Sequence, residues 1–202
     1  MKDLVILAAD KDLKFALEGL LARPEALGIR AIEKDVFVEP EHDPACALRG
    51  VEFLRTFAKQ YRHGLLIFDH EGSGREQQTR EQLQDGLNRA LDYIWGDGNA
   101  RAIVIAPELE AWVWSPSPHV AAITGWGTRQ PGLHRWLVHE GWLRKGEVKP
   151  ARPKEAFQAA LRQARQPRSA SLYRQLAERV SLRDCEDDAF REFRDVLRTW
   201  FS

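Results

Sequence analysis

The sequence predicts an α/β domain, a four-stranded parallel sheet flanked by helices, followed by a helical C-terminal region. Four short apolar segments alternate with longer segments in which apolar residues recur every three or four positions. This alternation is typical of parallel sheets, because parallel strands need a crossover between them. After residue 114 the strand-like segments stop and helix-like segments follow. We therefore expect an α/β core over 1–114 and helices packed on it over 115–202.

The first half of the core begins with an uninterrupted apolar run. Residues 4–9 predict a buried strand, because a strand covered on both faces need not alternate with polar residues. A helical stripe follows, with Asp12 as a candidate N-cap and Pro24 close to its end. The next strand is predicted over 29–38, and a helix over 45–61.

The second half repeats this order. Strands are predicted over 64–68 and 101–106, with a charged helix over 75–95 between them. The helices expected in the C-terminal region span about 131–139, 154–165, 170–180 and 187–201.

Composition excludes several classes of protein. The chain has 202 residues, of which 44% are hydrophobic and seven are Trp, so a disordered chain is not expected. Two cysteines with no C-x-x-C pair exclude a disulfide framework and a zinc-thiolate motif. The N-terminal apolar run is too short for a membrane span and lacks a signal-peptide cleavage site. We expect a cytoplasmic protein of bacterial type that does not bind membranes.

Charge is distributed unevenly, although the formal net charge is zero. Residues 1–140 contain 16 Lys and Arg against 21 Asp and Glu, whereas residues 141–183 contain 11 against 3. An acidic part followed by a basic segment suits a site that needs cations and binds an anion nearby. The alternative is that the arginines form only a solvated helix face.

Carboxylates follow three of the predicted strands. The residues that we expect to form an acidic site are Asp10, Asp69, Glu71 and Glu110. The C-terminal ends of parallel strands line the ligand crevice of an open sheet, so these side chains should approach one another. A divalent metal relieves their repulsion, and oxygen ligands suit Mg²⁺ or Mn²⁺. We expect Asp69, Glu71 and Asp10 to be the metal ligands.

Neighbouring residues receive structural interpretations. Asp12 is expected to cap a helix rather than bind metal, and Glu108 is expected at the surface. His70 should point away from Asp69 and serve packing or support. Trp112 and Trp114 are expected in the core, with a stacking platform for a base as the alternative.

Several segments together resemble the Toprim-like domains of a small branch found in bacterial defence islands. The similarity is closest to a Toprim-like component of methylation-associated anti-phage systems. The segments that carry the resemblance are Val5–Asp12, Arg23–Arg30, Leu66–Gly74, Pro107–Trp114, Lys149–Pro150, Pro153–Ala156, Asp184–Phe190 and Trp200–Phe201.

The resemblance implies Mg²⁺-supported cleavage or transfer of phosphodiesters, with DNA or RNA as a substrate and other defence proteins as partners. Its D-x-D step corresponds to Asp69 and Glu71, and its Glu-Trp step to Glu110 and Trp112. These residues, with Asp10, would then be catalytic acids.

The chain departs from the family pattern on the first strand. Where a glutamate is expected, the chain has Ala8. Either Asp10 replaces that carboxylate from a shifted position, or the general acid-base is absent. The second case predicts a catalytically inactive scaffold or sensor subunit of a multi-protein defence complex. A third interpretation is nucleotide binding without cleavage, because the same crevice suits a metal-bound triphosphate.

Overall fold

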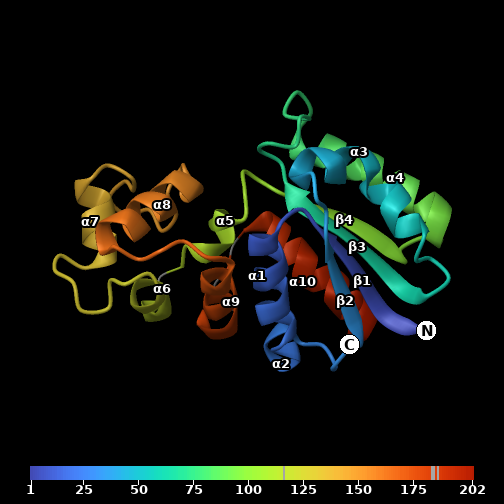
Figure 1. Cartoon of the computed structure of the whole chain (residues 1–202), viewed down its shortest axis with the longest axis horizontal. Coiled ribbons are helices and arrows are strands. Elements are labelled where there is room, and N and C mark those ends of the chain that lie inside the picture. The colour runs from blue at the N-terminus through green and yellow to red at the C-terminus, as the bar shows by residue number, and fades with distance from the viewer. Residues whose placement is uncertain (116, 183–184, 186) are drawn as a thin grey trace.

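The computed structural model describes residues 1–115, 117–182, 185 and 187–202 of the chain (Figure 1). Its helices and strands are, in chain order, β1 (Lys2–Ala8), α1 (Lys11–Leu21), α2 (Pro24–Leu27), β2 (Lys34–Val38), α3 (His42–Arg55), β3 (Tyr61–Asp69), α4 (Arg80–Trp95), β4 (Ala100–Ile105), α5 (Glu110–Val113), α6 (Pro118–Ile123), α7 (Leu133–His139), α8 (Pro153–Ala164), α9 (Ala170–Arg179) and α10 (Asp188–Phe201).

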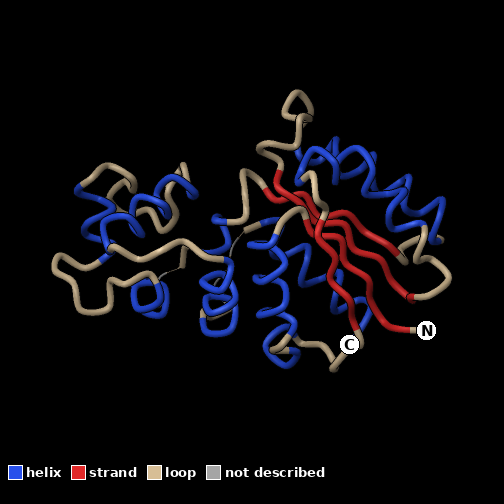
Figure 2. The backbone as a smooth tube through the Cα atoms, in the orientation of Figure 1, coloured by secondary structure: helices blue, strands red, loops and turns tan. Residues whose placement is uncertain are grey.

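The four strands form one parallel sheet in the order β2-β1-β3-β4, which confirms the predicted α/β fold (Figure 2). The central strands β1 and β3 are in register, with Leu7 opposite Leu66. Both segments are buried because helices cover both faces of the sheet. Their runs are therefore uninterrupted, as expected for strands that have no solvated side.

The helices lie in two layers. Helices α3 and α4 contact the sheet on one face, while α1 and α10 contact it on the other (Figure 1). The last helix of the chain therefore completes the covering of a sheet formed by the first half. The core is one continuous apolar cluster that includes residues of both halves.

The open edge of β4 is covered by side chains of α4. Gln84 Oε1 accepts a hydrogen bond from Val104 N at 2.8 Å, and Arg80 Nε donates to Val104 O at 2.7 Å. Asn88 Oδ1 accepts from Ala102 N at 2.8 Å. Backbone groups that a further strand would pair are thus already satisfied, which protects this edge from pairing with another chain.

The C-terminal region contacts the core through α9 and α10. Helix α9 packs on α1 where Gly19 allows close approach, because a Cβ at that position would lie 2.7 Å from Arg174 O and 2.8 Å from Ala177 Cβ. Helices α6, α7 and α8 lie farther from the sheet, at the opposite end of the molecule (Figure 1). There Trp126 packs against Trp136 with ring centroids 4.9 Å apart.

Some element boundaries differ from the expectation. The second strand spans only Lys34–Val38, because the chain first forms the short helix α2 and then an irregular segment. Helix α4 starts at Arg80 behind a Thr79–Gln82 capping box, and the short helices α5 and α6 form where no helix was predicted. None of the described helices is both long and apolar enough to cross a bilayer.

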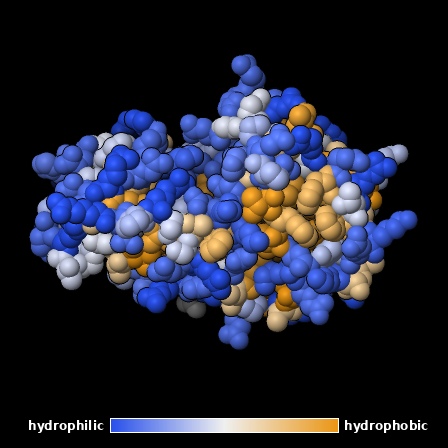
Figure 3. Space-filling model, in the orientation of Figure 1, coloured by the Kyte–Doolittle hydropathy of each residue, from blue (hydrophilic) through white to orange (hydrophobic). Residues whose placement is uncertain are grey.

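An aromatic group lies beside the edge strand β2. Phe37, which is 36% exposed, stacks on Phe57 with ring centroids 5.1 Å apart and meets Phe53 edge-on at 5.7 Å. Figure 3 shows hydrophobic side chains gathered on the half of the molecule that contains the sheet. These rings extend the core to the surface beside α3.

The covering of the sheet by α10 predicts a large effect of one core substitution. Phe193 is fully buried and packs against Trp112 and Phe190. We expect Phe193→Ala to lower the free energy of unfolding by about 3–5 kcal/mol, through lost burial and a cavity. Tyr93→Ala, at a 93% exposed ring on α4, should change it by about 0.5 kcal/mol or less. Urea denaturation followed by circular dichroism measures both, and equal effects would contradict this packing role of α10.

Candidate metal centre

A carboxylate stands at the C-terminal end of every strand. Asp10 follows β1, Glu39 follows β2, Asp69 is the last residue of β3, and Glu108 follows β4. Because the strands are parallel, these ends lie at one edge of the sheet. The sequence predicted this placement for β1, β3 and β4.

Three carboxylates converge at the ends of β3 and β4. Asp69, Glu108 and Glu110 each offer an oxygen, and the three oxygens lie within 4.8 Å of one another. Asp69 Oδ1 also accepts a hydrogen bond from Leu109 N at 2.9 Å, so the segment after β4 folds around the end of β3. A donor set made only of carboxylate oxygens fits a hard divalent cation such as Mg²⁺ or Mn²⁺.

Glu110 is held in place by α9 and by the segment before it. Tyr173 OH donates to Glu110 Oε1 at 2.6 Å. Arg168 Nη2 lies 3.7 Å from the same oxygen and 2.5 Å from Asp12 Oδ2. One arginine thus bridges an acid of α1 and an acid of α5.

The sequence led us to expect Glu108 at the surface. That expectation is wrong, because Glu108 is buried and only 2% exposed. Its Oε1 accepts a hydrogen bond from Lys154 N at 3.1 Å, and its Oε2 accepts one from Lys154 Nζ at 2.9 Å. The expectation was wrong because the partner is 46 residues away in sequence, at the start of α8. Local sequence carries no sign of such a contact.

Asp10 and Asp43 lie beside these three carboxylates. Asp10 Oδ1 accepts from Leu13 N at 2.7 Å, so Asp10 is the N-cap of α1, and the assignment of that role to Asp12 was wrong. Asp43 Oδ1 accepts from Asp69 N at 2.8 Å. Sequence analysis missed Asp43 because it lies in the first turn of α3, not at a strand end.

Glu71 lies apart from the converging carboxylates. Strand β3 ends at Asp69, so the alternation expected to align Glu71 with Asp69 stops before it. Glu71 is exposed, and its backbone N donates to Pro107 O at 3.1 Å. His70, between them, has its Nε2 3.0 Å from Gln78 O, in the loop that follows.

The two tryptophans after β4 pack as expected. Trp114 is buried, and its Nε1 donates to Pro153 O at 3.0 Å. Trp112 packs against Phe190 and donates to Asp187 Oδ1 at 3.0 Å. This links α5 to the starts of α8 and α10. In the resemblance segment 184–190, residues 184 and 186 lie outside those described.

Burial and crowding shift the titration of these acids. Burial raises the pKa of Asp69 well above its usual value, and the charges of Asp43 and Glu110 raise it further. Burial likewise raises the pKa of Glu110, although the Tyr173 hydroxyl opposes that shift. For Lys154, burial opposes the charged form, but the bond to Glu108 and the charges around it outweigh burial and raise its pKa.

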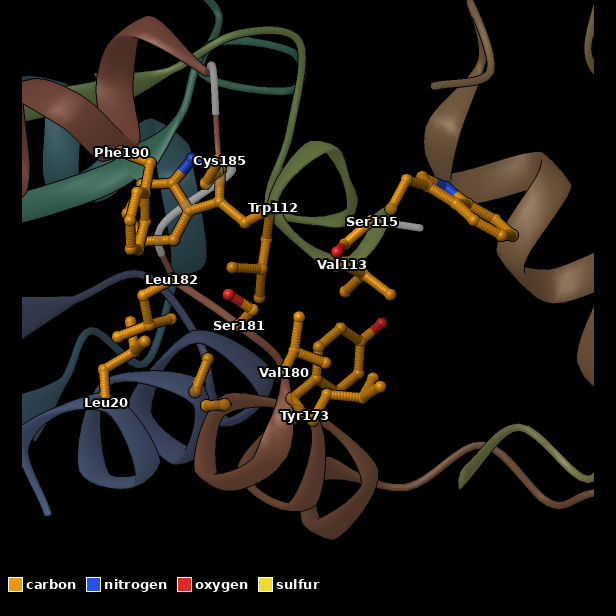
Figure 4. A pocket seen from close by; sticks show the side chains of 15 residues that line it. Leu20, Trp112, Val113, Ser115, Tyr173, Val180, Ser181, Leu182, Cys185 and Phe190 are labelled. Atoms are coloured by element: carbon orange, nitrogen blue, oxygen red, sulfur yellow. The ribbon is translucent and has the colours of Figure 1, made fainter. Parts of the chain in front are cut away.

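A small cavity lies between α1, α5, α9 and α10 (Figure 4). Its volume is about 50 Å³, and the described residues lining it carry no charged side chain. Tyr173 belongs to both places, since its ring lines the cavity while its hydroxyl binds Glu110. Its uncharged lining offers no cation to a nucleotide or a phosphate, so we place the chemistry at the carboxylates.

Comparison of the chain with protein-family models, with curated proteins and with solved structures gave no match.

The raised pKa of Asp69 predicts how stability depends on pH. A carboxyl group whose pKa is raised by folding contributes fully to the free energy of unfolding below its pKa in the unfolded chain, about 3.9. This contribution is lost as pH rises through the pKa of the group in the folded protein. Asn at this position keeps the acceptor for Leu109 N without the charge. In EDTA, Asp69→Asn should therefore unfold at a higher urea concentration than the unmodified protein at pH 7–8.

The difference should disappear near pH 4. Asp85→Asn, at an exposed position on α4, is the control and should follow the unmodified protein at every pH. A gain in stability of Asp69→Asn that stays constant from pH 4 to pH 8 would contradict the assignment.

Proposed function

We propose that this protein is a Mg²⁺- or Mn²⁺-dependent, phosphodiester-cleaving protein of Toprim-like type that acts on DNA or RNA in bacterial anti-phage defence. The observation that carries the proposal is the convergence of Asp69, Glu108 and Glu110 at the C-terminal edge of a parallel sheet. Ligand crevices of open α/β sheets lie at this edge. The defence setting follows from the resemblance alone.

Asp69, Glu108 and Glu110 would hold the divalent ion. When bound, the ion supplies charge stabilisation of the phosphate and lowers the pKa of a water molecule. The chain contributes the positions of the carboxylates: Leu109 N orients Asp69, and the Tyr173 hydroxyl orients Glu110. Asp10, at the end of the first strand, is the acid proposed to replace the carboxylate missing at Ala8.

The basic segment supplies a binding surface for a nucleic-acid backbone. Arg168 already reaches the carboxylates, through Asp12 and Glu110. Arg162 and Arg165, on the same segment, are exposed and form no ion pair with the described part of the chain. Arginines without an ion-pair partner, on the segment whose Lys154 and Arg168 reach the carboxylates, favour a polyanionic substrate.

A catalytically inactive scaffold is the second candidate. It is favoured by the ion pairs that Lys154 and Arg168 make with the acids, because they neutralise charge without metal. Ala8, which has no carboxylate to offer, favours it as well. Calorimetric titration separates the candidates: a scaffold should bind neither Mg²⁺ nor Mn²⁺ at millimolar concentration, whereas the proposed enzyme should bind both.

The proposal predicts that cleavage depends on the converging carboxylates. Purified protein with Mn²⁺ should cleave labelled DNA or RNA, and Asp69→Ala should reduce the rate at least about 100-fold, because even residues that only orient a metal ligand contribute 10- to 100-fold. Asp85→Ala, an exposed acid on α4, should leave the rate unchanged. The measurement is gel-resolved cleavage at matched protein concentration. Equal rates for Asp69→Ala and the unmodified protein would exclude this centre.

A further inference from the structure

Lys154 contacts Glu108 with both its backbone and its side chain. Its backbone N donates to one carboxylate oxygen at 3.1 Å, while Nζ donates to the other at 2.9 Å. The backbone bond also satisfies an N–H in the first turn of α8, whose N-cap Arg152 provides no side-chain cap. The start of α8 is therefore fixed at the carboxylates independently of the ammonium group.

The ammonium group occupies a carboxylate that the divalent ion would need. Nζ lies on Glu108, one of the three acids whose oxygens converge within 4.8 Å. It also interacts electrostatically with Glu110 and Asp69. An ammonium and a divalent cation on one carboxylate repel each other strongly where little solvent screens them. When a divalent cation binds the three acids, the ammonium of Lys154 is therefore expected to leave Glu108.

Lys154 is freer to move than the other cation at the site. Arg168 donates to Asp12 and to Tyr173 OH and lies near Glu110, so three partners fix its guanidinium. The two side chains are equally exposed, at 40% and 41%, but Nζ of Lys154 has Glu108 as its hydrogen-bond partner and sits on a flexible stem. Rotation about that stem redirects the charge toward solvent while the backbone bond to Glu108 persists.

We infer that Lys154 changes partner during function: it binds Glu108 when no divalent ion is present, and a non-bridging phosphate oxygen of the substrate when the ion is held. The inference rests on the proposed function. Lys154 is then a substrate-binding residue for phosphodiesters. The bond from its backbone N to Glu108 fixes the start of α8, so the released ammonium stays beside the place where the phosphate is held. An ammonium acts as a point charge toward phosphate and needs no fixed approach angle.

The test measures two affinities of Lys154→Met that should shift in opposite directions. Calorimetry with Mn²⁺ alone should show binding about 3- to 10-fold tighter than in the unmodified protein, because an internal competitor is gone. Fluorescence anisotropy with labelled single-stranded DNA and RNA of about 20 nucleotides, in Ca²⁺ to limit cleavage, should show binding about 10-fold weaker. That loss is typical of one charge-assisted hydrogen bond.

Lys59→Met is the matched control and should change neither affinity. Lys59 is exposed and precedes β3, whose opposite end carries Asp69. Lys154→Gln removes the charge but keeps a donor for Glu108, so it should reproduce both shifts if the Met variant folds poorly.

Four results would overturn the inference. Weakening of both affinities would indicate a purely structural role, and tighter metal binding with unchanged nucleic-acid binding would indicate an internal counter-ion only. Mn²⁺ binding of equal strength in all variants would exclude the exchange while leaving the metal centre intact. If neither the unmodified protein nor the variants bind Mn²⁺, the proposed function fails and the exchange fails with it.

Discussion

The repulsion among carboxylates at one sheet edge is the constraint on which the structure depends. Asp69, Glu108 and Glu110 converge in a region of low solvent exposure, where like charges are costly unless they are paired or protonated. Their partners Lys154 and Tyr173 both come from the C-terminal region. Helices from the second half of the chain therefore supply donors to the acidic edge of the core, in addition to the donor Leu109 N from the core itself.

The contacts that fold the C-terminal region are also those that position the site. The close approach of α9 to α1 at Gly19 places Tyr173 against Glu110. The bond from Trp114 Nε1 to Pro153 O fixes the start of α8, one residue before Lys154. A change in packing between the core and the C-terminal region would thus alter the electrostatics of the carboxylates, even if none of the acidic residues were substituted.

Sequence predicted the sheet and part of the site, and it failed where the outcome depends on distant contacts. Long apolar runs identify buried parallel strands because an uninterrupted run of apolar residues is a local feature of the sequence. Asp69 and Glu110 could be predicted because they follow such runs. The burial of Glu108 could not, since Lys154 lies 46 residues away. Glu71 was expected beside Asp69, but the strand ends before the alternation reaches it.

Charge balance favours a cation-binding site over a purely structural cluster. The described acids near the strand ends are Asp10, Asp12, Glu39, Asp43, Asp69, Glu108 and Glu110, whereas the cations bonded to them are Arg49, Lys154 and Arg168. Three cations do not neutralise seven carboxylates, and the charges of Asp43 and Glu110 add to the effect of burial in raising the pKa of Asp69. A core optimised for stability alone gains nothing from unneutralised acids, since apolar replacements of buried charges are often more stable. Protonation lowers the repulsion among these excess acids only in part. A divalent cation would lower it more fully and would release the bound protons.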